Sequence, residues 1–170
     1  MKKLSFFIIG LFILTTFSSC MEDAEVWDSS VNGLSGQWYV RYDSKTQKDP
    51  FGSGYTEALT FNTAADDGKE IYLTDIIDGT PSFWKYRVRV PVDVSKMSFG
   101  TNDVLTNDVE DYEIKVKVMN GKVTPKAKTL PSGYVADSIY FEIWYDDLPQ
   151  GTDKLIATGY RKTGFEEDEP

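Results

Sequence analysis

The feature that most restricts the fold of this chain is the alternation of apolar and polar side chains along several short segments. A β-strand places successive side chains on opposite faces of its sheet, so this period of two predicts strands with one buried face. The alternation is clearest in one segment, where the apolar residues are Tyr112, Ile114, Val116 and Val118 and the polar residues between them are Glu113, Lys115 and Lys117.

Eight segments rich in β-branched and aromatic residues are separated by Gly, Asn, Asp and Pro, as strands are separated by turns. Among the turns, Asn120-Gly121 is the strongest hairpin signal, because both residues tolerate the positive φ of a type I′ turn. Pro91 lies inside the fourth segment and removes a backbone donor, so we expect a bend, a bulge or a sheet edge there. The predicted strands are 37–43, 55–62, 70–77, 83–94, 112–119, 122–128, 138–145 and 154–162.

A sheet with one strongly apolar face must cover that face, and the sequence offers no sizeable helix to pack on it. We therefore predict an all-β fold, an eight-stranded antiparallel up-and-down barrel over residues 36–164. A barrel of this size is either filled by its own side chains or holds one small ligand. The candidate ligand-lining residues, which are equally consistent with ordinary core, are Trp84, Tyr86, Val88, Phe141, Ile143 and Tyr145.

The first nineteen residues have the pattern of an export signal. Lys2 and Lys3 precede an apolar run over residues 4–17, which is shorter than the roughly 20 residues of a transmembrane helix. The run ends in Ser18-Ser19-Cys20, which resembles the lipobox of bacterial lipoproteins. The resemblance implies cleavage before Cys20 and lipidation of Cys20, and several acyl chains give stable membrane anchoring.

Acidic residues follow directly, at Glu22, Asp23 and Glu25. They resemble the surface-export signal of Bacteroidota lipoproteins and are equally consistent with a solvated linker. We expect an anchor and linker over residues 20–35, a disordered acidic tail over 165–170, and a lipid-anchored position on the outer membrane, at the cell surface or the periplasmic face. The net charge of −9 repels phosphate groups, so we expect no nucleic-acid partner and membrane contact through the lipid only.

Gly36-Gln37-Trp38 opens the first predicted strand. A Gly-x-Trp at this place in an eight-stranded meander resembles the lipocalin and wider calycin signature. That resemblance implies that Trp38 closes one end of the barrel and that Arg161, on the last strand, packs across it. The lipobox, the chain length and the first strand, residues 38–42, are also similar to lipid-anchored lipocalin-like proteins of Bacteroidota, of the type labelled lipid-binding putative hydrolase.

The sequence contains no histidine, and its one cysteine is the predicted lipidation site. Ser-His-Asp and Cys-His catalysis and histidine-bound zinc are therefore excluded. Paired carboxylates can cleave glycosides, and acidic loops can bind calcium. The acidic residues near 108–111 and 146–147 are more simply read as solvated loop residues. We expect no catalytic residue, no metal and no cofactor.

Tyr140 and Trp144 alternate with Phe141 and Ile143, so the pattern places them on the outer face, where they are candidates for contact with a partner. Our leading interpretation is an outer-membrane lipoprotein that binds a small hydrophobic ligand in its barrel without catalysis. One alternative is a surface module that recognises a glycan or a protein and has a filled barrel. The last is a carboxylate-dependent hydrolase.

Overall fold

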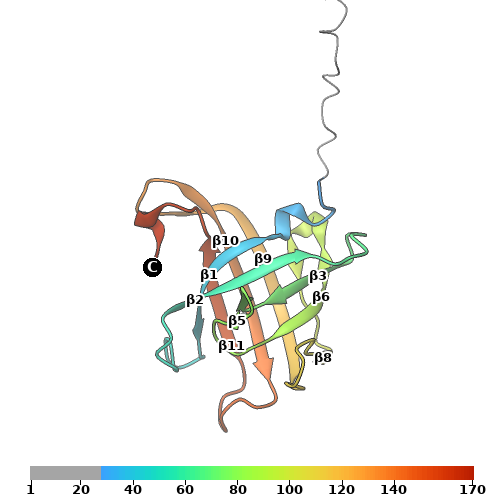
Figure 1. Cartoon of the computed structure of the whole chain (residues 1–170). Helices are drawn as coiled ribbons and strands as arrows, with labels where there is room; N and C mark the ends of the chain where they lie inside the picture. The colour runs from blue at the N-terminus through green and yellow to red at the C-terminus, as the bar shows by residue number, and fades with distance from the viewer. Residues whose placement is uncertain (1–27) are drawn as a thin grey trace, which may run out of the picture.

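One antiparallel sheet closes on itself in the computed structural model, which describes residues 28–170 (Figure 1). Its strand order is β10-β11-β1-β2-β3-β6-β7-β9-β8, and a further pairing between β9 and β10 closes the ring. The short strand β8 pairs only with β9 and is not part of the ring. The other eight strands surround the interior in chain order. The predicted all-β, up-and-down antiparallel barrel is therefore confirmed. None of the helices in residues 28–170 is long and apolar enough to cross a membrane.

The barrel strands run from Gly36 to Arg161 and differ greatly in length. They are β1 (Gly36–Asp43), β2 (Tyr55–Asn62), β3 (Glu70–Thr74), β6 (Arg87–Asp93), β7 (Ser98–Phe99), β9 (Lys115–Thr129), β10 (Val135–Tyr145) and β11 (Leu155–Arg161). The remaining elements are the small hairpin β4 (Ile76–Ile77) and β5 (Thr80–Pro81), the edge strand β8 (Leu105–Thr106) and the short helices η1 (Asn32–Leu34), η2 (Val94–Lys96) and η3 (Glu166–Asp168).

The alternation in sequence places one face of each long strand inside the barrel. In β10, for example, Phe141, Ile143 and Tyr145 are completely buried. Completely burying one large apolar side chain contributes about 1.5–3 kcal/mol, so these inner faces are the main source of stability. The buried cluster also includes Trp38, Val40 and Tyr42 of β1 and Val88 and Val90 of β6.

The predicted hairpin at Asn120-Gly121 is wrong, because β9 passes through these residues without turning. Lys122 pairs with Tyr140 and Met119 pairs with Glu142, so the two residues between them form a β-bulge. Asn120 has a φ of 53°, a conformation that serves a bulge as well as a type I′ turn. The predicted strands 112–119 and 122–128 are thus one strand, and the eighth barrel strand is β7, which lies between the predicted strands 83–94 and 112–119.

A two-residue hairpin turn does occur at Asp78-Gly79, which joins β4 to β5. Both residues have positive φ, 49° and 80°, as a type I′ turn requires. Pro91 pairs with Glu70 of β3, and on its other side the neighbour β7 pairs only with Val92 and Asp93. The proline therefore lies in an inner strand, at the point where the ladder between β6 and β7 ends.

The two chain ends of the described region pack against the barrel. In the expected linker, η1 and the residue before it bury Val31 and Leu34 completely. The expected disorder of the tail is wrong: Asp168 in η3 is only 2% exposed and accepts hydrogen bonds from Ser132 and Thr163. The predicted signal peptide and Cys20 lie outside the described residues.

Candidate functional site

The barrel has one end closed by Trp38, which we call the Trp38 end. The indole Nε1 of Trp38 donates to the Thr60 hydroxyl at 2.8 Å, and that hydroxyl donates to the Leu34 carbonyl at 2.6 Å. The guanidinium carbon of Arg161 lies 4.4 Å from the Trp38 ring centroid, and its Nε donates to Asp137. This is the contact that the lipocalin resemblance implies. A buried indole with a satisfied donor and a cation on its face makes a fixed closure.

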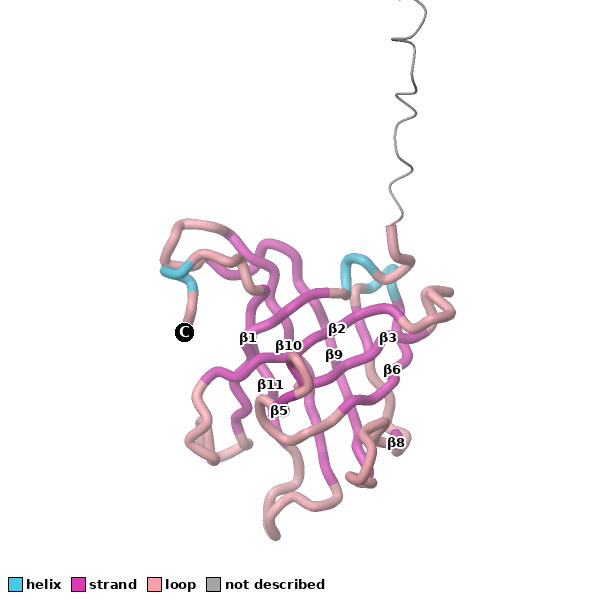
Figure 2. The backbone as a smooth tube through the Cα atoms, in the orientation of Figure 1, coloured by secondary structure: helices cyan, strands magenta, loops and turns pink. Residues whose placement is uncertain are grey.

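The opposite end, which we call the mouth, is formed by the loops over residues 44–54, 75–86, 107–114 and 146–154. Figure 2 shows the loop between β10 and β11 and the segment around β8 at the lower end of the barrel. Three aromatic residues, Phe51, Phe83 and Trp84, cover the interior here, and we call them the aromatic cap. Phe83 stacks on Tyr42 with ring centroids 4.0 Å apart, and Trp84 stacks on Tyr145 at 5.2 Å. Phe51 packs on both other cap rings and is 39% exposed, so the outer side of the cap meets solvent.

A single carboxylate fastens the cap to the neighbouring loops. Asp147 accepts one hydrogen bond from Trp84 Nε1 at 2.8 Å and another from the Tyr112 hydroxyl at 2.6 Å. Partial burial and the bond to Asp147 raise the pKa of Tyr112 to about 12, so the phenol remains a donor at neutral pH. Asp147 therefore links three of the four mouth loops.

The backbone of the cap is wrapped around a second carboxylate, that of Asp75, which is completely buried. Its two oxygens accept hydrogen bonds from the consecutive backbone N–H groups of residues 83–86 at 2.5–3.0 Å. Removal from water raises the pKa of Asp75, and the four donors oppose that shift. Consecutive N–H groups converging on one anion form a nest, so Asp75 fixes the position of Phe83 and Trp84.

Behind the cap, three tyrosine hydroxyls lie inside the barrel. The hydroxyls of Tyr42 and Tyr86 are 2.9 Å apart and hydrogen-bonded. The hydroxyl of Tyr145 is buried and has no hydrogen-bond partner, although its ring lies 5.6 Å from that of Tyr86. The three hydroxyls therefore make a polar place near the mouth, next to apolar side chains of the barrel core.

The structure places the predicted ligand-lining residues in two groups. Tyr86, Val88, Phe141, Ile143 and Tyr145 are completely buried within the barrel. Trp84 lies outside the strands, in the cap, because residue 85 has a φ of 64° and interrupts the alternation. Their role in binding a ligand stays a prediction.

Tyr140 and Trp144 lie on the outer side of β10, away from the cap. Tyr140 is 37% exposed and its hydroxyl donates to Glu142. Trp144 is partly buried, with the Lys117 ammonium 5.4 Å from its ring centroid. The two side chains thus share the outer face of β10, with Glu142 between them, and their role in contact with a partner stays a prediction.

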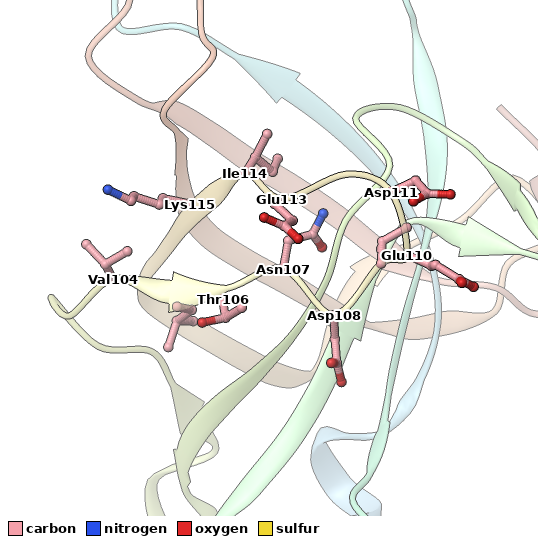
Figure 3. Close-up of a pocket in the computed structure, with 11 residues that line it drawn as sticks. Val104, Thr106, Asn107, Asp108, Glu110, Asp111, Glu113, Ile114 and Lys115 are labelled. Atoms are coloured by element: carbon pink, nitrogen blue, oxygen red, sulfur yellow. The ribbon is translucent and has the colours of Figure 1, made fainter.

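A surface pocket of about 630 Å³ lies beside the mouth, lined by residues 104–111 and 113–115 (Figure 3). Asn107 holds its wall in place: the buried amide donates to the Lys85 and Tyr112 carbonyls and accepts from Arg87 N–H. The carboxylates of Asp108 and Glu110 point in different directions in Figure 3. Within residues 28–170, no three acidic, histidine or cysteine side chains are grouped to hold a metal ion.

Comparison with protein families matches residues 23–166 to the family described as "Lipid-binding putative hydrolase". The chain belongs to this family. The match covers every barrel strand, both ends of the barrel and the aromatic cap. A search of curated proteins found no match. Membership in this lipid-binding family and the barrel fold together support lipid binding.

Proposed function

We propose that this chain is an outer-membrane lipoprotein, anchored through Cys20, that binds a small hydrophobic ligand in its barrel and does not catalyse a reaction. The observation that carries the proposal is the aromatic cap. Its rings rest directly on interior residues, Phe83 on Tyr42 and Trp84 on Tyr145, while its outer side is open to solvent. The family description, which names lipid binding, supports the same ligand class.

Binding would use the cap as the entrance. Phe83 and Trp84 occupy the interior end of the mouth as side chains of a loop, not of a barrel strand. A hydrophobic molecule that takes their place buries its own apolar surface against the same tyrosine rings. Such burial is worth roughly 25 cal/mol per Å² of apolar surface, so a single acyl chain can offset the loss of the ring contacts.

The anchor and the location rest on the lipobox-like Ser18-Ser19-Cys20 and on the apolar run before it. Absence of histidine supports a binding role, because the commonest hydrolytic arrangements need an imidazole. A Cys20→Ala variant tests the anchor. We expect it to lose acyl labelling and to leave the membrane fraction, and an unchanged membrane fraction would contradict the anchor.

Native mass spectrometry of the mature chain with Cys20→Ser tests the ligand. We expect a co-purified hydrophobic adduct that denaturation releases. A matched variant, Phe83→Ala with Trp84→Ala, should exchange that adduct faster than a Tyr140→Ala control on the outer face. A chain that carries no adduct and takes up no hydrophobic probe would contradict the proposal. If the chain instead hydrolyses a lipid ester, and one carboxylate substitution abolishes that activity, the function is hydrolysis and not binding.

A further inference from the structure

The Tyr145 hydroxyl is a buried polar group without a partner. Tyr145 is completely buried, and its oxygen makes no hydrogen bond. Among the described side chains, the only other buried polar atom in this condition is Nε of Arg87. Most buried polar atoms are hydrogen-bonded in folded proteins, and each exception calls for an explanation, such as a bound molecule. Phenylalanine would fill the same space without leaving an unpaired hydroxyl.

The position of Tyr145 relates this hydroxyl to the entrance. Its ring lies directly beneath Trp84, with the two planes 7° from parallel. It also contacts Tyr86, whose own hydroxyl is already engaged by Tyr42. A molecule that displaces Trp84 therefore meets the Tyr145 ring, and the one unengaged hydroxyl of the three tyrosines is available to it.

The charges around this place disfavour an anion. The Asp75 carboxylate is bonded to the Tyr86 backbone N–H at 2.7 Å, and Asp147 fastens the cap above. Carboxylates also outnumber lysines in the four mouth loops. A carboxylate or phosphate entering here would lose its hydration and would face these carboxylates. The Lys85 ammonium lies 5.6 Å from the ring centroid of Tyr112, but among the described residues no cation lies over the rings of Tyr42, Tyr86 or Tyr145.

We propose that the Tyr145 hydroxyl binds a neutral polar group of the ligand, such as an alcohol or an ester oxygen on an otherwise apolar molecule. This inference rests on the proposed function, since it concerns the polar end of the same ligand. Burial raises the pKa of Tyr145 well above its ordinary value, so the hydroxyl is protonated and can donate.

The test uses three probes with the same twelve-carbon chain: dodecanol, methyl dodecanoate and dodecanoic acid. Binding to the mature chain is measured by the change in tryptophan fluorescence at neutral pH and checked by native mass spectrometry. We expect the alcohol and the ester to bind more tightly than the acid. Tyr145→Phe should weaken alcohol and ester binding by about 3- to 10-fold, the worth of one hydrogen bond, and leave the acid unaffected.

The control variant is Tyr86→Phe, which breaks the existing bond to Tyr42. It should lower the melting temperature, whereas Tyr145→Phe should leave it unchanged or raise it, because no protein partner is lost. Equal affinities of wild type and Tyr145→Phe for all three probes would overturn the inference while leaving the binding function intact. Failure of the wild-type chain to bind any probe would overturn the proposed function and the inference with it.

Discussion

The two ends of the barrel use aromatic residues in opposite ways. At the Trp38 end, the indole is completely buried, its N–H is paired, and Arg161 covers its face. At the mouth, the rings of Phe51 and Trp84 remain partly exposed, and the indole N–H of Trp84 is held by a carboxylate at the surface. Both ends thus use an aromatic ring with a hydrogen-bonded indole N–H. Where the indole is buried, the closure is permanent. Where water can compete for the hydrogen bond, the closure can open.

The largest effect should come from the permanent closure. Trp38→Ala removes a buried indole, its hydrogen bond to Thr60 and the surface under Arg161. We expect the free energy of unfolding to fall by about 3–5 kcal/mol, measured by chemical denaturation. Trp144→Ala, on the outer face, is the control and should cost much less. Equal losses from both variants would contradict the distinction between closure and surface.

Asp75→Ala should have the next largest effect, because it leaves four N–H groups at the mouth, one buried and three partly buried, without their acceptor. We expect a loss of about 1–3 kcal/mol, the range for buried groups deprived of a partner. Hydrogen exchange should accelerate at residues 83–86 and not at β1. Uniform acceleration through the whole barrel would show that Asp75 supports the fold and not the cap alone.

Asp147→Asn should change stability by no more than about 1 kcal/mol, because the hydrogen bonds that it weakens lie near the surface. Its larger consequence should be kinetic, with faster release of a bound hydrophobic probe in stopped-flow fluorescence. Asp146→Asn is the matched neighbour and should leave that rate unchanged. A release rate that is the same in all three proteins would mean that the cap does not control exchange.

Acid and alkali should weaken different contacts, with the smallest effects of the series. The pKa of Tyr112 is raised from 10.0 to about 12, so the stability from its protonated contact with Asp147 is lost as pH rises through that interval. Asp66 has a lowered pKa because Ser29 and Ser30 donate to it, so its contribution is present above 3.8 and is lost as pH falls below that value. Hydrogen exchange at both extremes checks this. Unchanged exchange at residues 107–114 in alkali, or at residues 28–30 and 63–69 in acid, would contradict it.

Sequence alone predicted the barrel because its strands carry a local signal, the alternation of side chains. The sequence-based prediction failed where a β-bulge and a hairpin turn have the same local sequence pattern. Asn120-Gly121 and Asp78-Gly79 both suit positive φ, yet only the second forms a hairpin turn. Gly121 pairs with Phe99 of β7, whose ring lies 2.3 Å from where a Cβ at Gly121 would be, so the glycine serves a close approach between strands. The strand β7 has two residues and no periodicity of its own, so no sequence pattern indicated this contact.

The mouth was harder to predict, because long-range contacts assemble it. Trp84 and Asp147 are 63 residues apart in sequence and meet through loop residues. The predicted strand 83–94 extended the alternation of β6 backwards and so placed Trp84 inside, whereas the nest around Asp75 turns that segment away from the sheet. An aspartate directly after an apolar strand was the available signal, and it is too common to identify such a nest.

The N-terminal segment is pinned to the turn between β2 and β3, since Ser29 and Ser30 both bond to Asp66. The described chain thus begins at the Trp38 end, as Figure 1 shows. A mechanical load applied along that segment would reach the rigid closure first and spread into β2 and β3. The mouth lies at the far end of the strands, so holding the protein by its leading segment places no direct load on the aromatic cap.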